Sequence, residues 1–166
     1  MKLRTLKRSV VTFCVNHIFA GTRSFKMKRR LLRSIGHEIG EGTKIVGPVT
    51  CTGTLRIGEN CWIGRDLTVN GNGTVTIGDN CDLAPNVMFL TGGHQIGDGS
   101  RRAGKGETYS ISVGAGTWIG ARATIMKDVH IGSGCVVAAC ACVGTDIADH
   151  VLAGGVPAKP IRELER

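Results

Sequence analysis

The chain of 166 residues is 42% hydrophobic but only 4% aromatic, contains 25 glycines and carries a formal net charge of +8. This composition argues against an ordinary globular core and suits a single domain with a narrow interior that admits only small aliphatic side chains. The charge is uneven, because residues 1–37 hold ten Lys or Arg and no acidic residue. No recognisable nucleic-acid-binding module accompanies these basic residues, so we expect no nucleic-acid partner.

The first predicted element is a basic helical arm over residues 1–38. Apolar residues recur at intervals of three or four from Leu3 to Ile18, the spacing of an amphipathic helix, and a second basic helix is predicted from Phe25 to Ser34. The apolar run within the first helix is too short to span a bilayer. Three interpretations stay open: the arm caps the end of the domain, it lies on a membrane surface, or its start is a weak signal peptide.

From residue 39 onward, an apolar residue returns at every sixth position. Neither an amphipathic helix nor a half-buried strand has this period, because positions six apart fall on different helix faces and a strand alternates at every second residue. Glycine often follows the apolar residue, and the fourth position after it is small or apolar. Each hexad therefore reads as a short strand followed by a tight corner. The fifteen hexad starts are Ile39, Ile45, Cys51, Ile57, Ile63, Val69, Ile77, Leu83, Phe89, Val113, Ile119, Ile125, Ile131, Val137 and Val143.

These hexads predict an all-β fold, a parallel β-helix in the form of a three-sided prism with about six coils, over residues 39–156. Such a prism exposes flat faces and therefore favours self-association. Two departures interrupt the repeat: a two-residue surplus around residues 70–73, and a polar, glycine-rich loop over residues 92–110. Long loops on rigid scaffolds tend to carry functional residues. Residues 157–166 are expected to form a short C-terminal tail.

Seven cysteines fall mostly where the repeat requires a small or apolar residue, Cys140 among them. We interpret them as small core residues in a reducing compartment, which argues against export and predicts a cytoplasmic protein. The sequence has no C-x-x-C pair, and its five histidines contain no H-x4-H pair of the kind that the zinc site of a γ-type carbonic anhydrase needs. We therefore expect no metal.

Several segments resemble those of the hexapeptide-repeat acyltransferases, in the same order: V-T-I-G-D-N-C, A-P-N-V, T-G-G-H, W-I-G and A-G-G-V-P-A-K-P-I-R. The resemblance is greatest to the galactoside and maltose O-acetyltransferases and covers Val75 to Glu163, over half of the chain. It implies a left-handed coil, a homotrimer, acetyl-CoA as the acyl donor, and an active site in each cleft between neighbouring prisms.

The resemblance carries over to individual residues. His94 matches the family's catalytic histidine, which would act as the general base. Asn70 matches a substrate-side asparagine, and Glu107 and Tyr109 from the loop are predicted to lie on the substrate side with it. The residues predicted to bind acetyl-CoA are Gly120, Ala121, Ala138 and Ala139 along the pantetheine arm, Lys159 and Arg162 near the nucleotide, and Trp118 and Gly144 beside them.

Some roles stay open at this point. Asp98 or Glu107 could orient the imidazole of His94, although both also read as solvated loop charges. Trp118 could contact coenzyme A, or pack at a corner or an interface. Gln95 stands where the family usually has proline, and Gly144 begins a Gly-Thr pair that replaces a common Thr-Lys pair.

The expected function is acetyl-CoA-dependent transfer of an acetyl group to a hydroxyl of a sugar or related small acceptor, in surface-polysaccharide biosynthesis. The acceptor would be a small molecule or a lipid-linked sugar. The enzyme would be cytoplasmic, or peripheral at the inner face of the membrane through weak contact of its N-terminal arm. The alternatives are a non-catalytic trimeric assembly module, or an acetyltransferase for serine, a xenobiotic or an amino-sugar amine.

Overall fold

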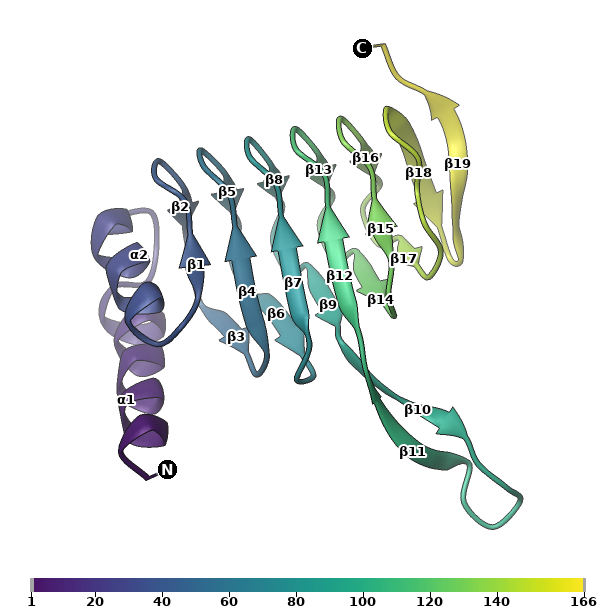
Figure 1. Ribbon diagram of the computed structural model, residues 1–166. Coiled ribbons are helices and arrows are strands. Elements are labelled where there is room, and N and C mark those ends of the chain that lie inside the picture. Colours follow the sequence, from purple (N-terminus) through teal and green to yellow (C-terminus); the bar gives the residue numbers. More distant parts are fainter. Residues whose placement is uncertain (1, 166) are drawn as a thin grey trace.

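The computed structural model describes residues 2–165, which form a three-sided parallel β-solenoid preceded by helices (Figure 1). Fourteen of the fifteen hexad starts are buried, and only Cys51 is partly exposed. Strands of successive coils pair in parallel with equivalent residues aligned, as in Ile45 with Ile63 and Ile63 with Leu83. The prediction of one inward-facing apolar residue on every face of the coil is therefore confirmed.

The strands form three faces, each of which is a sheet. The first face contains β1 (Glu38–Ile39), β4 (Thr54–Ile57), β7 (Thr74–Ile77), β12 (Ser110–Val113) and β15 (His130–Ile131). The second face contains β2 (Lys44–Ile45), β5 (Trp62–Ile63), β8 (Asp82–Leu83), β13 (Trp118–Ile119), β16 (Val136–Val137), β18 (Val151–Gly155) and β19 (Ala158–Glu163). The third face contains β3 (Val49–Cys51), β6 (Leu67–Asn70), β9 (Met88–Leu90), β14 (Thr124–Met126) and β17 (Cys142–Val143).

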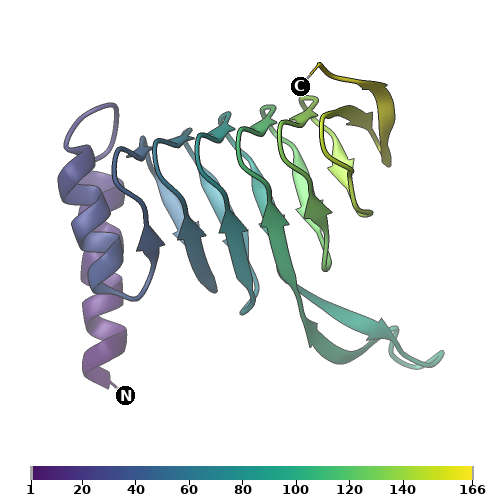
Figure 2. The ribbon, with the colours of Figure 1, turned by 45° about the horizontal axis from the view of Figure 1, so that its top comes forward.

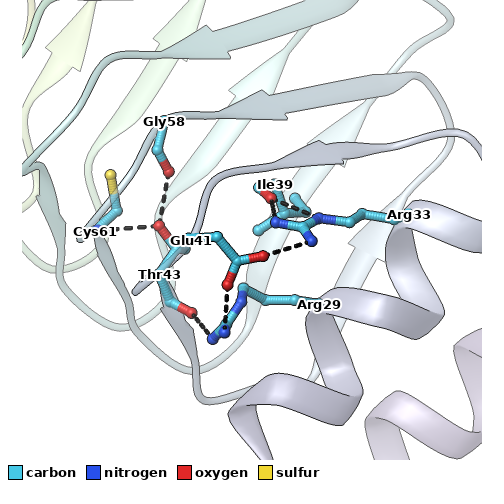
Figure 3. Close-up of polar contacts among 7 residues, drawn as sticks. All are labelled: Arg29, Arg33, Ile39, Glu41, Thr43, Gly58 and Cys61. Atoms are coloured by element: carbon cyan, nitrogen blue, oxygen red, sulfur yellow. Dashed lines mark hydrogen bonds and ion pairs between the residues drawn. The ribbon is translucent and has the colours of Figure 1, made fainter.

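Small side chains at the corner between the first and second faces satisfy backbone groups inside the solenoid. Thr43 Oγ1 donates a hydrogen bond to the carbonyl of Gly58 at 2.7 Å and accepts one from the amide of Cys61 at 3.0 Å (Figure 3). Thr117 repeats this arrangement with the amide of Cys135 at 3.1 Å. Because a buried backbone group without a partner is costly, the small residue at this hexad position serves hydrogen bonding as well as packing.

Three parts of the structure differ from what the sequence predicted. The glycine-rich loop contains a two-stranded antiparallel hairpin of β10 (Gly92–Ile96) and β11 (Ala103–Thr108). The predicted C-terminal tail contains β19, which pairs antiparallel with β18 at the edge of the second face. Cys140, predicted in the core, is exposed at a corner with a φ of +61°. Antiparallel pairing and left-handed corner residues are not encoded in the six-residue pattern.

The N-terminal arm consists of α1 (Lys2–Phe13), a π-helical turn η1 (Cys14–Ile18) and α2 (Phe25–Ser34). It covers the end of the solenoid at which β1 begins, opposite β19 (Figures 1 and 2). Its residues Val11, Val15 and Leu32 belong to the same buried cluster as the solenoid core, so the inward side of the arm caps the solenoid. No helix within residues 2–165 has the length and hydrophobicity needed to cross a bilayer.

Two arginines of α2 hold the arm on the first coil. Glu41 binds Nη2 of Arg29 at 3.0 Å and Nη1 of Arg33 at 2.8 Å, and the same arginines donate to the carbonyls of Thr43 and Ile39 (Figure 3). The hydrogen bonds from Arg33 and Arg29 lower the pKa of Glu41. The Glu41 side chain is 67% exposed, so these ion pairs add little stability. The bonds to backbone carbonyls are what fix the position of the helix.

Lys28 is a fully buried side chain between the arm and the solenoid. Its Nζ donates to the carbonyl of Gly21 at 2.6 Å and to that of Val46 at 3.0 Å, and it lies 4.9 Å from the ring centre of Phe25. Burial lowers the pKa of Lys28 from 10.5 to about 8, because the charged form is costly to remove from water. Below this pH the folded chain has to hold a buried charge.

We expect the free energy of unfolding of the wild type, relative to that of Lys28→Met, to rise between about pH 8 and pH 10. In this window the folded chain holds a neutral Lys28 while the unfolded chain still binds the proton, so raising the pH favours folding, by ~2 kcal/mol in total. Chemical denaturation at a series of pH values measures the difference. Lys26→Met, at an exposed lysine of the same helix, is the control. A stability difference that stays constant across the window would contradict the prediction.

Candidate active site

His94 lies on the hairpin that leaves the solenoid between β9 and β12 (Figure 1). In this hairpin Gly92 pairs with Thr108, and His94 pairs with Gly106. The pairing becomes irregular after His94, and the residue is exposed. The predicted catalytic histidine is thus presented on a hydrogen-bonded two-stranded element and not on an irregular loop.

The backbone carbonyl of Gly104 orients the imidazole of His94. Its oxygen lies 2.9 Å from Nδ1 and can only accept a hydrogen bond, so Nδ1 carries the proton and Nε2 of the neutral ring keeps its lone pair. The two carboxylates considered for this role are engaged elsewhere: Asp98 accepts hydrogen bonds within its own turn, and Glu107 accepts one from Tyr109. Sequence reasoning missed Gly104 because any residue supplies a carbonyl.

A cavity of 270 Å³ brings His94 together with two of the predicted substrate-side residues, Asn70 and Glu107. Asn70 ends β6, and its carbonyl accepts a hydrogen bond from the amide of Thr91, at the base of the hairpin, at 2.8 Å. Gly71 approaches the hairpin so closely that a Cβ there would lie 2.4 Å from the amide nitrogen of the residue that begins β10. The two-residue surplus and the hairpin therefore pack as one unit.

Tyr109, predicted on the substrate side, lies against Gly93 and is not among the residues that line this cavity. Its hydroxyl donates a hydrogen bond to Oε2 of Glu107 at 2.6 Å, which lowers the pKa of Glu107 and raises that of Tyr109. The side chain of Gln95 lowers the pKa of the same carboxylate further. The Tyr109–Glu107 hydrogen bond thus lies at the end of β11, and it is the Tyr109 ring against Gly93 that contacts the strand carrying His94.

Several predicted acetyl-CoA residues lie at another corner, between the second and third faces. Gly120 and Ala138 occupy equivalent positions in successive coils, and Gly154 and Lys159 continue the same row into β18 and β19. A Cβ at Gly120 would lie 2.5 Å from the amide nitrogen of Ala139, so the stacking of the coils requires glycine there. We name the row Gly120, Ala138, Gly154 and Lys159 the corner ridge.

The other predicted residues are distributed around this ridge and beyond it. Ala121 and Ala139 follow two of its members; Ala121 is partly exposed and Ala139 is exposed. Arg162 lies further along β19, and Trp118 is 55% exposed on the second face. Gly144 follows β17, so it lies at the hairpin's corner and is separated from the ridge. Among residues 2–165, no cluster of His, Cys, Asp or Glu side chains is arranged to hold a metal ion.

Within one chain, the histidine and the ridge stay apart. Asn70 and the hairpin lie at the corner between the third and first faces, whereas the ridge lies between the second and third. The third face separates them, and its strands of two to four residues span roughly 10 Å. A ligand that touches both sets has to cross this face or lie between two chains.

Gly93→Ala should lower the pKa of Tyr109 toward its ordinary value of 10.0. A Cβ at Gly93 would lie 2.8 Å from the tyrosine hydroxyl, so the ring has to move and lose its hydrogen bond to Glu107. Tyr109 is the only tyrosine in the sequence, so tyrosinate absorbance during an alkaline titration reports this residue alone. Gly99→Ala, where a Cβ meets nothing within 4 Å, is the control. An unchanged titration in Gly93→Ala would refute this packing.

Comparisons with known proteins agree with the motifs. Residues 110–145 match the family model for bacterial transferase hexapeptide (six repeats), and residues 54–88 match that for the hexapeptide repeat of succinyl-transferase. The galactoside O-acetyltransferase of Escherichia coli K12 is 34% identical over 139 residues, which cover 82% of this chain and 68% of that protein.

Solved structures match the whole fold. A galactoside acetyltransferase in complex with coenzyme A superposes with a TM-score of 0.85 at 28% identity, covering 99% of this chain and 82% of that one. A hexapeptide-repeat-containing acetyltransferase from Vibrio cholerae, complexed with acetyl coenzyme A, gives 0.86 at 26% identity, covering 99% and 89%. These matches confirm the predicted left-handed parallel β-helix. Because the galactoside O-acetyltransferase of Escherichia coli K12 is 34% identical over most of both sequences, the chain belongs to the hexapeptide-repeat acyltransferases.

Proposed function

We propose that the protein is an acetyl-CoA-dependent O-acetyltransferase that acetylates a hydroxyl of a sugar or related small acceptor. The observation that carries this proposal is the contact of His94 Nδ1 with the carbonyl of Gly104, which leaves Nε2 able to accept a proton beside the cavity that Asn70 lines. A hydroxyl is too weak an acid to attack a thioester unaided near neutral pH, so a base has to take its proton during the attack. The names of the relatives support the donor and the acceptor class, since they include a galactoside O-acetyltransferase and complexes with coenzyme A or acetyl coenzyme A.

In this mechanism Nε2 of His94 accepts the proton of the acceptor hydroxyl as the hydroxyl oxygen attacks the thioester carbonyl carbon. A C–O bond forms, the C–S bond breaks, and the imidazolium returns the proton to the departing thiolate. The Nδ1–H bond to the carbonyl of Gly104 persists in both protonation states, so the ring keeps one orientation throughout. Asn70, in the same cavity, is suited to hold the acceptor hydroxyl through its side-chain amide.

The corner ridge suits the pantetheine arm of acetyl-CoA. Gly120, Ala138 and Gly154 place backbone with small or no side chains in successive layers, which lets an extended chain lie close to the backbone amides. The row leads to Lys159, an exposed ammonium that can bind a phosphate of the nucleotide, with Arg162 three residues further on. Such exposed contacts are screened by salt.

A complete site then requires a second chain, and we expect a homotrimer. The hairpin and the ridge lie at different corners of one prism, so a ring of three prisms can place the hairpin of one chain against the ridge of the next in every cleft. In this arrangement all three sites are equivalent, and a monomer is inactive.

The cellular setting stays a prediction. We expect surface-polysaccharide biosynthesis in the cytoplasm, with a small-molecule or lipid-linked sugar as the acceptor. A non-catalytic assembly module is less well supported, because the oriented imidazole of His94 serves no purpose in such a protein.

His94→Ala should lower kcat by ~10²–10⁴ while acetyl-CoA binding and assembly are kept, because the substitution removes only the proton acceptor. Thiol release from acetyl-CoA, measured with a panel of sugars, nucleotide sugars and lipid-linked sugars, reports both the rate and the acceptor. His130→Ala is the matched control, since His130 is exposed on the first face and is hydrogen-bonded to Ser112. A folded His94→Ala protein with near wild-type kcat would overturn the mechanism.

Two inactive variants should restore activity when their chains assemble together. His94→Ala removes the base, and Ala139→Trp blocks the exposed side of the ridge. When equal amounts are refolded together, about a quarter of all clefts, one in every mixed trimer, combine an intact hairpin from one chain with an intact ridge from the other. The readout is thiol release before and after mixing. Absence of recovery from verified mixed trimers, or a mass by light scattering of one 17.5 kDa chain, would contradict the shared site.

A further inference from the structure

The helix α1 carries an apolar stripe on a side that does not pack on the solenoid. Leu3, Leu6, Val10 and Phe13 are 81, 61, 53 and 57% exposed. At 3.6 residues per turn these four positions fall within an arc of about 80°. Val11, on another side of the same helix, is buried in the core cluster. We name Leu3, Leu6, Val10 and Phe13 the α1 stripe.

Two cations of α2 point away from the solenoid. Lys26 and Arg30 are exposed and lie two residues before and after Lys28, which places them about 200° around the helix from it. Because the Nζ of Lys28 binds carbonyls inside the cap, the opposite side of α2 faces outward. We name Lys26 and Arg30 the outer cations.

A positively charged cavity of 380 Å³ lies where α1 meets the end of α2. Lys7, Arg8 and Arg33 line it, and none of its lining residues is acidic. Lys7 donates to the carbonyl of Ser34 at 2.7 Å, and Arg8 donates to the carbonyl of Cys51 at 3.0 Å. These bonds fix Lys7 and Arg8 but leave their charges uncompensated, because a carbonyl is neutral, whereas Arg33 is paired with Glu41.

The stripe and the cations lie at one end of the molecule. Figures 1 and 2 both show α1 and α2 across the end of the solenoid that is opposite β19, with no strand on their outer side. We propose that this end docks on an anionic phospholipid surface, with the α1 stripe inserted among the headgroups. The outer cations then face the lipid phosphates, as in helices that lie in the plane of a membrane interface.

Charge favours a lipid surface over a second copy of this chain as the partner. Residues 1–37 hold ten basic residues and no acidic one, so two such ends brought together would repel each other. An anionic bilayer supplies the opposite charge and an apolar layer beneath it. The proposed trimer, with its prisms side by side, would present three arms to the same surface and strengthen binding through multivalency. That reinforcement rests on the proposed function, whereas the docking of a single arm does not.

Co-sedimentation of the full chain with vesicles of phosphatidylglycerol and phosphatidylcholine tests the proposal at low salt. Leu6→Glu/Val10→Glu removes the centre of the α1 stripe, and Lys26→Glu/Arg30→Glu reverses the outer cations. The matched control, Val156→Glu/Ile161→Glu, places the same two charges on apolar side chains that are 76 and 61% exposed at the opposite end. All six side chains are exposed, and circular dichroism checks that each variant is folded.

We expect the wild type and the control pair to bind these vesicles, and both arm variants to partition at least about tenfold more weakly. Raising the salt concentration should weaken wild-type binding, and pure phosphatidylcholine should bind little. Equal binding by the arm and control variants, or no wild-type binding to anionic vesicles, would overturn the proposal. A change in mass of Leu6→Glu/Val10→Glu without vesicles would also overturn it, because the stripe would then cover another chain. No acyl donor or acceptor is present, so each of these three outcomes leaves the proposed acetyl transfer standing.

Discussion

The stacking of equivalent residues in successive coils is the constraint on which the rest of the structure depends. Ile45, Ile63 and Leu83 lie in line, and each coil hydrogen-bonds to the next over the whole solenoid. A residue inserted within a face would shift the pairing with both neighbouring coils, so insertions are confined to corners. The surplus after Asn70 and the hairpin of His94 are insertions at one corner in successive coils, and their contact creates the cavity.

The solenoid could be predicted because its signal is repeated fifteen times, and a single irregular position such as Cys51 does not obscure it. The elements that the sequence did not reveal lack a repeat. Six glycines interrupt any alternation in the hairpin, at positions 92, 93, 97, 99, 104 and 106. Pro160 and several charges make β19 read as a tail, although proline and charged side chains are what an edge strand tolerates.

The candidate site could likewise be predicted from the sequence only in part. His94 and Asn70 could be identified from motifs, whereas the group that orients His94 is a backbone carbonyl, which no residue type marks. Glu107 and Tyr109 were assigned together to the substrate side, yet they pair with each other, and only Glu107 lines the cavity. The N-terminal arm is a further example, because its composition does not distinguish a buried basic residue from an exposed one. Helical phase separates Lys28, which holds the cap, from Arg30, which faces outward.

The rigidity of the cap links the two proposals. The carbonyl of Val46, in the first coil, accepts a hydrogen bond from Lys28, so the arm cannot shift without leaving a buried donor or acceptor unpaired. Coil stacking transmits that fixed position to β9, which lies two coils above β3 and leads directly into the hairpin. Two coil spacings and the thickness of one helix place β9 roughly 20 Å above the outer side of α1. A surface bound by the arm would therefore lie at a fixed distance from the hairpin, which favours acceptors whose hydroxyl can reach from a lipid anchor to His94.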